Sequence, residues 1–221
     1  MGHASTLSEI CRESEYKEQF EVIVRSATRL KRIIEDFSNV ASFQTGDLKM
    51  MHKVVDVRSL INEVVASFQA EALKKRIQLT KKIPHANLLV SGDREKLGLV
   101  LSNLLENAVT YTRDNGHVLV AAERLAGYIK VSIIDDGIGI AAKDIPHIFD
   151  RFYQVESHLT RHHGGVGLGL SVAKAMIELH NGQIWVESIE GKGSNFSCLL
   201  PLRDEQATRP QKVPAFEPGS V

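Results

Sequence analysis

The sequence is poor in several features, and each shortage excludes a class of protein. Its 221 residues include two cysteines, Cys11 and Cys198, which lie far apart and match no metal-binding or redox spacing. Neither charge is in excess, because 27 Lys and Arg residues balance 27 Asp and Glu residues. A neutral chain has no general attraction to nucleic acid or to an anionic membrane surface. We therefore expect neither as a partner, and any phosphate group must be held by local geometry.

Long apolar runs are also absent. The sequence has no signal peptide and no run of about 18 apolar residues, which predicts a chain that neither enters nor crosses a membrane. We expect a cytoplasmic location, within a parent protein that is either soluble or membrane-anchored. With 43 % hydrophobic and 24 % charged residues, the composition is that of an ordinary globular protein of one or two domains.

The first part of the chain carries a heptad pattern. Over residues 15–42 the apolar side chains recur at alternating steps of three and four, which favours a helix in a bundle or coiled coil. A single amphipathic helix lying on a globular core is the alternative. Residues 44–47 then interrupt the helix, and residues 56–75 predict another helical stretch. The heptad seam consists of Phe20, Ile23, Ala27, Leu30, Ile34, Phe37 and Ala41.

The rest of the chain mixes strand and helix patterns. The patterns predict strands at 76–83, 87–92, 117–124, 128–135, 183–188 and 194–201, and helices at 93–112 and about 170–180. Asp93 is a suitable N-cap for the longer helix, and Asn181-Gly182 a suitable end for the shorter one. The longer helix has an apolar stripe that consists of Leu97, Val100, Leu101, Leu104, Leu105 and Ala108. This mixture predicts an α+β fold, a sheet with helices on one face. Residues 203–221 contain three prolines and little apolar content, which predicts a disordered tail or a linker.

Two candidate ligand positions lie on the long helix and after a strand. Asn103 and Asn107 are four residues apart and share one helix face, and an amide oxygen is a neutral, hard ligand suited to Mg²⁺. For one such pair alone, solvated or backbone-bonded amides are the more common explanation. Asp135 precedes Gly137 and Gly139 at a strand end. Its carboxylate could accept from the amine of adenine, although this sequence alone is also typical of a turn.

A second glycine-rich stretch, GGVGLGL at residues 164–170, opens a helix. Backbone N–H groups and the helix dipole make such a start a phosphate site. It lacks the preceding strand of a dinucleotide-binding motif and the lysine of a P-loop. Residues 150–166 before it are polar and long for a loop, which predicts a lid. The three histidines of this segment, at 158, 162 and 163, have no cysteine or paired carboxylate beside them and do not predict a metal site.

Taken in order, these motifs resemble the catalytic and ATP-binding part of sensor histidine kinases. NLLENA (103–108) resembles the N box of that family, and DDGIGI (135–140) resembles its D-x-G-x-G box. IFDRFYQ (148–154) resembles the F box, and GVGLGL (165–170) the second glycine box. Each box alone is weak evidence, but four in order at the family's spacing are highly specific. The resemblance covers about residues 7–202.

The resemblance implies a two-layer α/β sandwich of the Bergerat type, also found in gyrase- and Hsp90-type ATPases, with a mixed sheet, helices on one face and a preceding helical dimerisation arm. It implies ATP and Mg²⁺ as cofactors, a homodimer formed through the arm, and a response regulator receiver domain as partner. The domains implied are 1–50, a remnant of the dimerisation and phosphoacceptor hairpin; 51–75, a connecting helical segment and the start of the catalytic domain; 76–202, the ATP-binding catalytic domain; and 203–221, the tail or linker.

The resemblance also assigns roles to single residues. Asn107 would bind Mg²⁺ with Asn103 beside it, as the catalytic pair, and Asp135 would accept a hydrogen bond from the adenine amine. Gly137 and Gly139 would shape the wall of the adenine site. The other nucleotide-binding residues that it implies are Tyr111, Ile140, Phe149, Gly165, Gly167, Leu168 and Gly169.

Three positions depart from the family's pattern. Thr110 stands where lysine is frequent, Gln154 where arginine is usual, and Val166 where threonine or serine is favoured. Positive charge near the phosphates could come instead from Arg113, Arg151 or Arg161.

The phosphoacceptor motif is missing as well. None of the nine histidines has the H-E/D-x-x-x-P context of the acceptor, so we expect the acceptor histidine upstream of Met1 in a longer parent. Two other functions remain open. A hydrolytic ATPase of the same fold is disfavoured because Asn103 cannot take a proton from water. A non-catalytic nucleotide-sensing or docking module would agree with the three departures.

Overall fold

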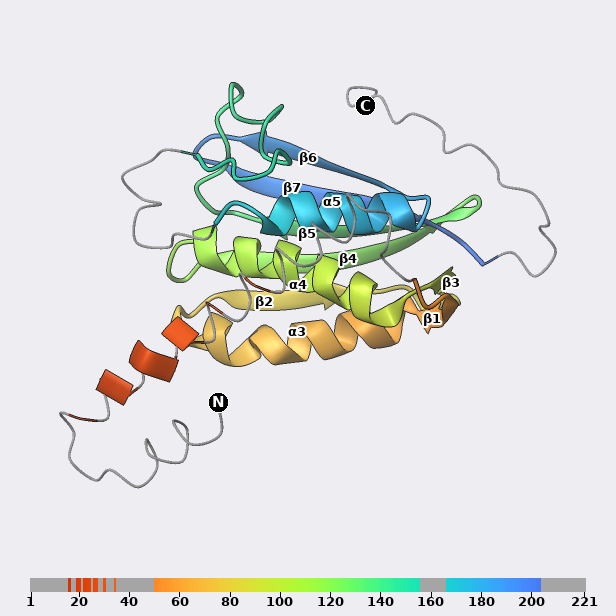
Figure 1. Cartoon of the computed structure of the whole chain (residues 1–221), viewed down its shortest axis with the longest axis horizontal. Helices are drawn as coiled ribbons and strands as arrows, with labels where there is room; N and C mark the ends of the chain where they lie inside the picture. The colour runs from red at the N-terminus through yellow and green to blue at the C-terminus, as the bar shows by residue number, and fades with distance from the viewer. Residues whose placement is uncertain are drawn as a thin grey trace. The chain divides into compact units, whose positions relative to one another are not determined.

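In the computed structural model (Figure 1), residues 50–155 and 166–203 are described, together with single helical positions between residues 16 and 34. The chain falls into two compact units, residues 1–48 and residues 49–221. The centre of the predicted lid, 156–165, lies outside the described residues, as do residues 204–221 of the predicted tail.

In the first unit, the described positions are helical. Five residues of the heptad seam are among them: Phe20, Ile23, Ala27, Leu30 and Ile34. Ile23, Leu30 and Ile34 are 55 %, 58 % and 60 % exposed. The helix therefore presents apolar side chains that this unit does not bury. Phe37 and Ala41 lie outside the described residues.

A five-stranded mixed sheet forms the frame of the second unit. Its strand order is β2-β4-β5-β7-β6. Strand β2 runs parallel to β4, whereas the other neighbouring pairs are antiparallel. This architecture confirms the predicted α+β fold with a mixed sheet. The strands are β2 (Gln78–Lys82), β4 (His117–Leu125), β5 (Tyr128–Asp135), β7 (Gly193–Pro201) and β6 (Gln183–Ile189).

Three helices lie across one face of this sheet (Figure 1): α3 (Val57–Lys74), α4 (Arg94–Tyr111) and α5 (Gly169–Leu179). Asp93 caps α4 as predicted, since its carboxylate accepts from the backbone N–H groups of Glu95 and Lys96. Within the described residues, no helix has both the length and the apolar character needed to cross a membrane. The predicted apolar stripe of α4 is buried throughout: Leu97, Val100, Leu101, Leu104, Leu105 and Ala108.

A short strand before α3 was not predicted from the sequence. Strand β1 (Lys53–Asp56) pairs antiparallel with β3 (Leu89–Gly92), and the two form a separate two-stranded sheet. Four residues are too few to show a clear alternation, and the partner strand lies more than thirty residues away in the chain. Asp56 then caps α3 by accepting from the backbone N–H of Arg58 at 3.0 Å. The helix therefore begins only at residue 57.

A buried histidine joins the ends of two helices. His180 Nδ1 donates to the Met176 carbonyl at 2.7 Å, and its Nε2 accepts from the Asp93 N–H at 2.9 Å. Burial lowers the pKa of His180, which agrees with a neutral ring in these contacts. Asp93 also accepts from the Met51 N–H at 3.0 Å. His180 and Asp93 thus connect the start of α4 with the end of α5 and with the segment before β1.

Candidate nucleotide-binding site

Helix α4 contacts both glycine-rich loops. Near its middle, Asn103 Nδ2 donates to the Gly169 carbonyl at 3.1 Å, at the first residue of α5. At its last residue, the Tyr111 carbonyl accepts from the Ile138 N–H at 3.2 Å. These contact points are eight residues apart, or about 12 Å along a helix axis. Asn107 lies midway, one turn from each, so the structure brings the predicted N box to both loops.

Lys75 holds the end of α4 in place. Its ammonium group donates to the carbonyls of Val109, Thr110 and Thr112 at 2.8, 2.8 and 2.9 Å. Burial lowers the pKa of Lys75, and the cation also suits the negative end of the helix dipole. Sequence reasoning missed this residue, because nothing in the local pattern connects the end of α3 to the end of α4. The contact fixes the turn on which Tyr111 lies.

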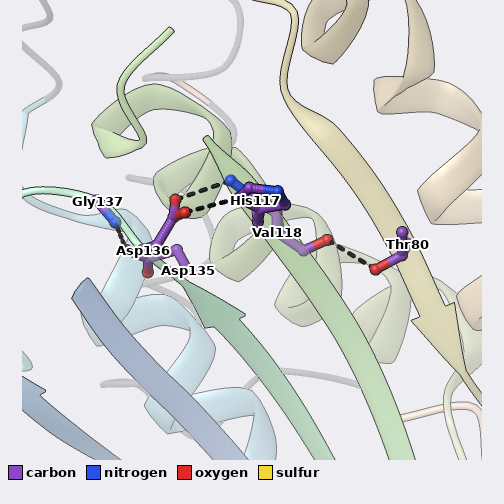
Figure 2. Close-up of polar contacts among 6 residues, drawn as sticks. All are labelled: Thr80, His117, Val118, Asp135, Asp136 and Gly137. Atoms are coloured by element: carbon purple, nitrogen blue, oxygen red, sulfur yellow. Dashed lines mark hydrogen bonds and ion pairs between the residues drawn. The ribbon is translucent and has the colours of Figure 1, made fainter. Parts of the chain in front are cut away.

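The carboxylate of Asp135 is buried at the end of β5. The residue is 8 % exposed, and its Oδ1 accepts from the Gly137 N–H at 2.9 Å (Figure 2). Desolvation by burial raises the pKa of Asp135 to about 6, against the backbone hydrogen bonds from Gly137 and Ser194, and the charge of Asp136 adds to the rise. A buried carboxylate whose pKa is strongly raised is typical of a functional site.

Close backbone contacts explain the glycines around Asp135. A Cβ atom at Gly137 would lie 2.5 Å from the Tyr111 carbonyl oxygen, and one at Gly193 would lie 2.0 Å from that of Asp135. Gly139 has φ +65°, and its Cβ would lie 2.1 Å from the carbonyl oxygen of Ile189. The loop is therefore packed against α4 on one side and the β6–β7 hairpin on the other.

Hydrogen bonds attach the same loop to the hairpin. The Ile140 N–H donates to Ser188 Oγ at 2.9 Å, and the Gly191 N–H donates to the Ile138 carbonyl at 2.7 Å. The position of Asp135 thus depends on a hairpin about fifty residues further along the chain. Sequence reasoning identified the loop but not this support.

The F box packs on β7 and on the second glycine box. Phe149 meets Phe196 of β7 edge to face, with ring centroids 6.5 Å apart. The Phe152 N–H donates to the Gly167 carbonyl at 2.9 Å. Gly167 has φ +74°, and a Cβ there would lie 2.7 Å from the Tyr153 carbonyl oxygen. The F box and the glycine box therefore fit together only with glycine at position 167.

A buried carboxylate supports the turns that carry the F box. Asp144 is 6 % exposed, and its Oδ1 accepts from the Tyr153 hydroxyl at 2.7 Å. His147 donates from Nδ1 to Asp150 at 3.0 Å, and its ring lies 5.5 Å from that of Tyr153. These contacts order residues 144–153 without a regular helix. None of them was predicted from the sequence.

The second glycine box places an uncapped helix start beside Asn103. Leu168 is 2 % exposed and stands at the N-cap position of α5, where no side chain caps the helix. The first backbone N–H groups of α5 consequently have no side-chain acceptor at the N-cap. Gly165 lies outside the described residues, as do Arg161 and the three histidines of the predicted lid.

The described residues contain no group of three or more His, Cys, Asp or Glu side chains that could hold a metal ion. Asn107 is half-buried on α4. Of the basic residues expected near the phosphates, Arg113 and Arg151 are exposed.

Comparison with known proteins identifies the fold and the family. The family described as histidine kinase-, DNA gyrase B-, and HSP90-like ATPase matches residues 92–204. The sensor histidine kinase WalK of Bacillus subtilis (strain 168) is 32 % identical over 191 residues, which cover 85 % of this chain and 31 % of that protein. The chain thus spans about a third of the length of this curated relative.

Two solved structures show the same fold. The catalytic domain of the histidine kinase ThkA is 30 % identical, with a TM-score of 0.62, and covers 69 % of this chain and 96 % of that one. ThkA in complex with the response regulator protein TrrA has a TM-score of 0.66 at 24 % identity, and covers 91 % of this chain and 56 % of that one.

The family match spans the buried carboxylate loop, the N-box helix and the described part of the second glycine box. The chain belongs to the histidine kinase-, DNA gyrase B- and HSP90-like ATPase family. Within that family, its second unit is an ATP-binding catalytic domain of the sensor histidine kinase type.

Proposed function

We propose that this chain binds ATP with Mg²⁺ and transfers the γ-phosphate to a histidine, from which it passes to the receiver domain of a response regulator. The observation that carries this proposal is the arrangement of both glycine loops along α4. Tyr111 contacts the Asp135 loop, and Asn103 contacts the start of α5. One nucleotide can therefore lie along the helix, with its base at Asp135 and its phosphates at α5.

The two loops suit opposite ends of ATP. The carboxylate of Asp135 accepts from the exocyclic amine of adenine, and the glycines beside it let a flat base approach the backbone. The start of α5 offers backbone N–H groups and the positive end of a helix dipole, without a negative side chain that would repel phosphate. We assign Gly167 and Gly169 to the phosphates, with Gly165 included on the sequence resemblance alone, and Ile140, Phe149 and Leu168 to apolar contacts with the nucleotide.

The residues present fit a magnesium ion. Mg²⁺ is held in phosphoryl-transfer sites by one or two protein oxygens together with substrate phosphates and water. Asn107 supplies a half-buried amide oxygen between the two loops. A bound Mg²⁺ would neutralise charge on the phosphates during transfer. Asn103 is 2 % exposed and bonded to Gly169, so it positions the glycine box beside the metal ligand.

Replacing Asn107 by alanine is expected to weaken ATP binding roughly 10- to 100-fold in the presence of Mg²⁺, and much less without metal. The estimate follows from about 1.5–3 kcal/mol for a contact to a charged group. Calorimetric titration of ATP with and without Mg²⁺ measures both values. Asn62→Ala is the matched control, since Asn62 is another half-buried helical asparagine, on α3. Equal losses with and without metal would give Asn107 a purely structural role.

The partners follow from the same proposal. The exposed apolar residues Ile23, Leu30 and Ile34 suit a homodimer through the helical arm. The structure of ThkA with TrrA supports a response regulator as the receiving partner. We place the reaction in the cytoplasm.

Phosphoryl transfer can be tested directly with the full chain. Incubated alone with γ-labelled ATP, the chain is expected to remain unlabelled, because none of its histidines has the acceptor context and transfer depends mainly on positioning. Addition of a helical hairpin with an H-E/D-x-x-x-P sequence should give acid-labile, base-stable label on the hairpin. Label on a histidine of this chain alone would contradict the proposal.

A nucleotide-sensing module is the second candidate, favoured by Thr110, Gln154 and Val166 at positions where the family has other residues. Tight ATP binding without any label on the added hairpin would select it. Hydrolysis is disfavoured, since Asn103 stands where a general base is needed and an amide cannot accept a proton from water.

A further inference from the structure

The C-terminal end of α4 lacks the features that usually complete a helix. Its C-cap, Thr112, is extended at φ −73° and ψ 138°, so the chain does not pass through the left-handed conformation of a glycine cap. Within α4, which is described throughout, no basic side chain lies in the last turn. The Ala108 carbonyl accepts from the Thr112 N–H at 3.0 Å. The carbonyls that follow have no partner within the helix and must find one elsewhere in the fold.

Two parts of the chain satisfy these carbonyls. The ammonium group of Lys75 donates to three of them, at 2.8, 2.8 and 2.9 Å: Val109, Thr110 and Thr112. The carbonyl that lies between them in sequence, on Tyr111, accepts instead from the Ile138 N–H of the Asp135 loop at 3.2 Å. The loop therefore contacts α4 inside the turn that Lys75 holds.

The contacts use every proton of the Lys75 side chain. An ammonium group has three N–H donors and no acceptor, and its three partners here are all carbonyl oxygens. Its positive charge also lies at the negative end of the α4 dipole. The backbone adds a fourth contact, since the Lys75 carbonyl accepts from the Asn115 N–H at 3.0 Å. One residue at the end of α3 thus holds residues 109–115 by its main chain and its side chain.

The Asp135 loop packs closely against this turn. A Cβ atom at Gly137 would lie 2.5 Å from the carbonyl oxygen of Tyr111 and 2.9 Å from its carbonyl carbon. Ile138 bonds to the same oxygen, and the Gly137 N–H donates to the Asp135 carboxylate at 2.9 Å. A shift of the Tyr111 backbone therefore reaches the carboxylate through adjacent contacts.

Other contacts attach the loop to the sheet. At its start, the carboxylate of Asp136 accepts from the N–H and the ring Nδ1 of His117 on β4, both at 2.8 Å (Figure 2). Burial opposes ionisation of Asp136, but these hydrogen bonds outweigh it and lower its pKa. Further along, the Ile140 N–H donates to Ser188 Oγ on β6 at 2.9 Å. Since both partners belong to strands, the end of α4 is the contact that aligns the loop with the helices.

We propose that Lys75 is a positioning residue for the base end of the nucleotide site. By completing the last turn of α4, it fixes the backbone of Tyr111, and through it the direction in which the Asp135 carboxylate faces adenine. This inference rests on the proposed function, in which that carboxylate accepts from the adenine amine. It makes Lys75, which lies outside all four sequence boxes, a determinant of adenine selectivity.

Amide hydrogen exchange in the nucleotide-free full chain tests the positioning. Lys75→Met keeps the length of the side chain and removes its three donors. The Ile138 N–H should then exchange roughly 10-fold faster, because its acceptor lies in a helix turn that opens more often. The reference is the Val172 N–H in the first turn of α5, which donates to the Leu168 carbonyl at 2.9 Å. Its exchange should change far less, whereas a general loss of stability would accelerate both.

Two further variants separate the contacts of Lys75 from a general effect of substitution. Lys75→Arg keeps a cation with several donors, although in a planar group, and should restore most of the Ile138 protection. Lys74→Met is the matched control, because Lys74 is the exposed preceding residue at the end of α3, and it should leave both amides unchanged. If Lys75→Met does not fold, Lys75→Gln, which keeps one amide donor, provides the same comparison.

Nucleotide selectivity should change in parallel. Lys75→Met is expected to lower ATP affinity roughly 5- to 30-fold, because the hydrogen bond to the adenine amine is misaligned. GTP affinity should fall much less, since GTP presents a carbonyl oxygen where ATP presents an amine. A smaller folded fraction would lower both affinities by the same factor. Calorimetric titration with the two nucleotides measures the ratio.

Unchanged exchange at Ile138 in the folded variant, or equal acceleration at Ile138 and Val172, would overturn the inference. An unchanged ratio of ATP to GTP affinity would do the same. Absence of ATP binding by the unmodified chain would instead overturn the proposed function. The two failures are distinguishable, because amide exchange is measured without nucleotide.

Discussion

Replacement of Asp135 by asparagine is expected to weaken ATP binding roughly 5- to 150-fold while leaving the fold intact. The residue is 8 % exposed, and one of its oxygens already accepts from the Gly137 N–H. Asparagine has the same shape and can keep this contact, but it turns an NH₂ donor toward the adenine amine. An unmatched buried polar pair costs about 1–3 kcal/mol, which gives the stated range of affinity.

Calorimetric titration with ATP and GTP measures this effect. GTP presents a carbonyl oxygen where ATP presents an amine, so Asp135→Asn should lose ATP affinity but not GTP affinity. Asp114→Asn is the control, because Asp114 is an exposed acid just beyond α4 that pairs with Arg76 at 3.6 Å. Unchanged ATP affinity in a folded Asp135→Asn variant would remove Asp135 from the base site.

The same residue predicts a pH dependence. The pKa of Asp135 is about 6, and the adenine amine is bound best by the ionised carboxylate. ATP affinity of the unmodified chain should therefore be constant well above pH 6 and should fall as the pH drops through 6. Asp135→Asn has no proton to take up at this position, so its weaker affinity should lose this dependence.

Replacement of Gly139 by alanine is expected to destabilise the second unit by about 2–5 kcal/mol and to abolish ATP binding. Left-handed backbone at φ +65° costs a residue with a Cβ atom about 1–2 kcal/mol. The Cβ would also lie 2.1 Å from the carbonyl oxygen of Ile189, and relief of such overpacking costs typically about 1–3 kcal/mol more. Either the loop or the β6–β7 hairpin must move, and Asp135 moves with it.

Gly127 offers a matched control for the cost of left-handed backbone alone. Gly127 has φ +79°, and a Cβ there would meet no atom within 4 Å. Gly127→Ala should therefore cost only the conformational part, about 1–2 kcal/mol, and should leave ATP binding unchanged. Urea unfolding of both variants gives the difference. If Gly139→Ala costs no more than Gly127→Ala, the loop is not held against the hairpin as described.

Local sequence patterns were sufficient for most of the regular elements and for proposing a set of nucleotide-binding residues. The apolar stripe of α4 and its Asp93 cap were predicted from periodicity and capping chemistry, and both are confirmed. The order of the four boxes predicted the ATPase fold, and the family match confirms it. The helix stripe, the cap and each single box involve residues close together in the chain, so a linear pattern is enough to recognise them.

Other features depend on contacts between distant parts of the chain. Strand β1 forms by pairing with β3. Lys75 donates to three carbonyls at the end of α4, and His180 accepts from the Asp93 N–H. No local pattern distinguishes Lys75 from an exposed lysine or His180 from an ordinary helix-end residue. Their roles exist only once the fold has brought the partners within hydrogen-bond distance.

The sequence by itself therefore determined the fold family and the candidate residues for ATP binding, because short motifs of carboxylate, amide and glycine residues can be recognised along the chain. Only the tertiary structure decided how those residues are held. Gly139 needs its φ +65° because the Ile189 carbonyl lies against it, and Asp136 is ionised beside Asp135 because β4 brings His117 to it. Packing and electrostatics act through space, and the neighbours of a site residue are set by the sheet register and the hairpin rather than by position along the chain.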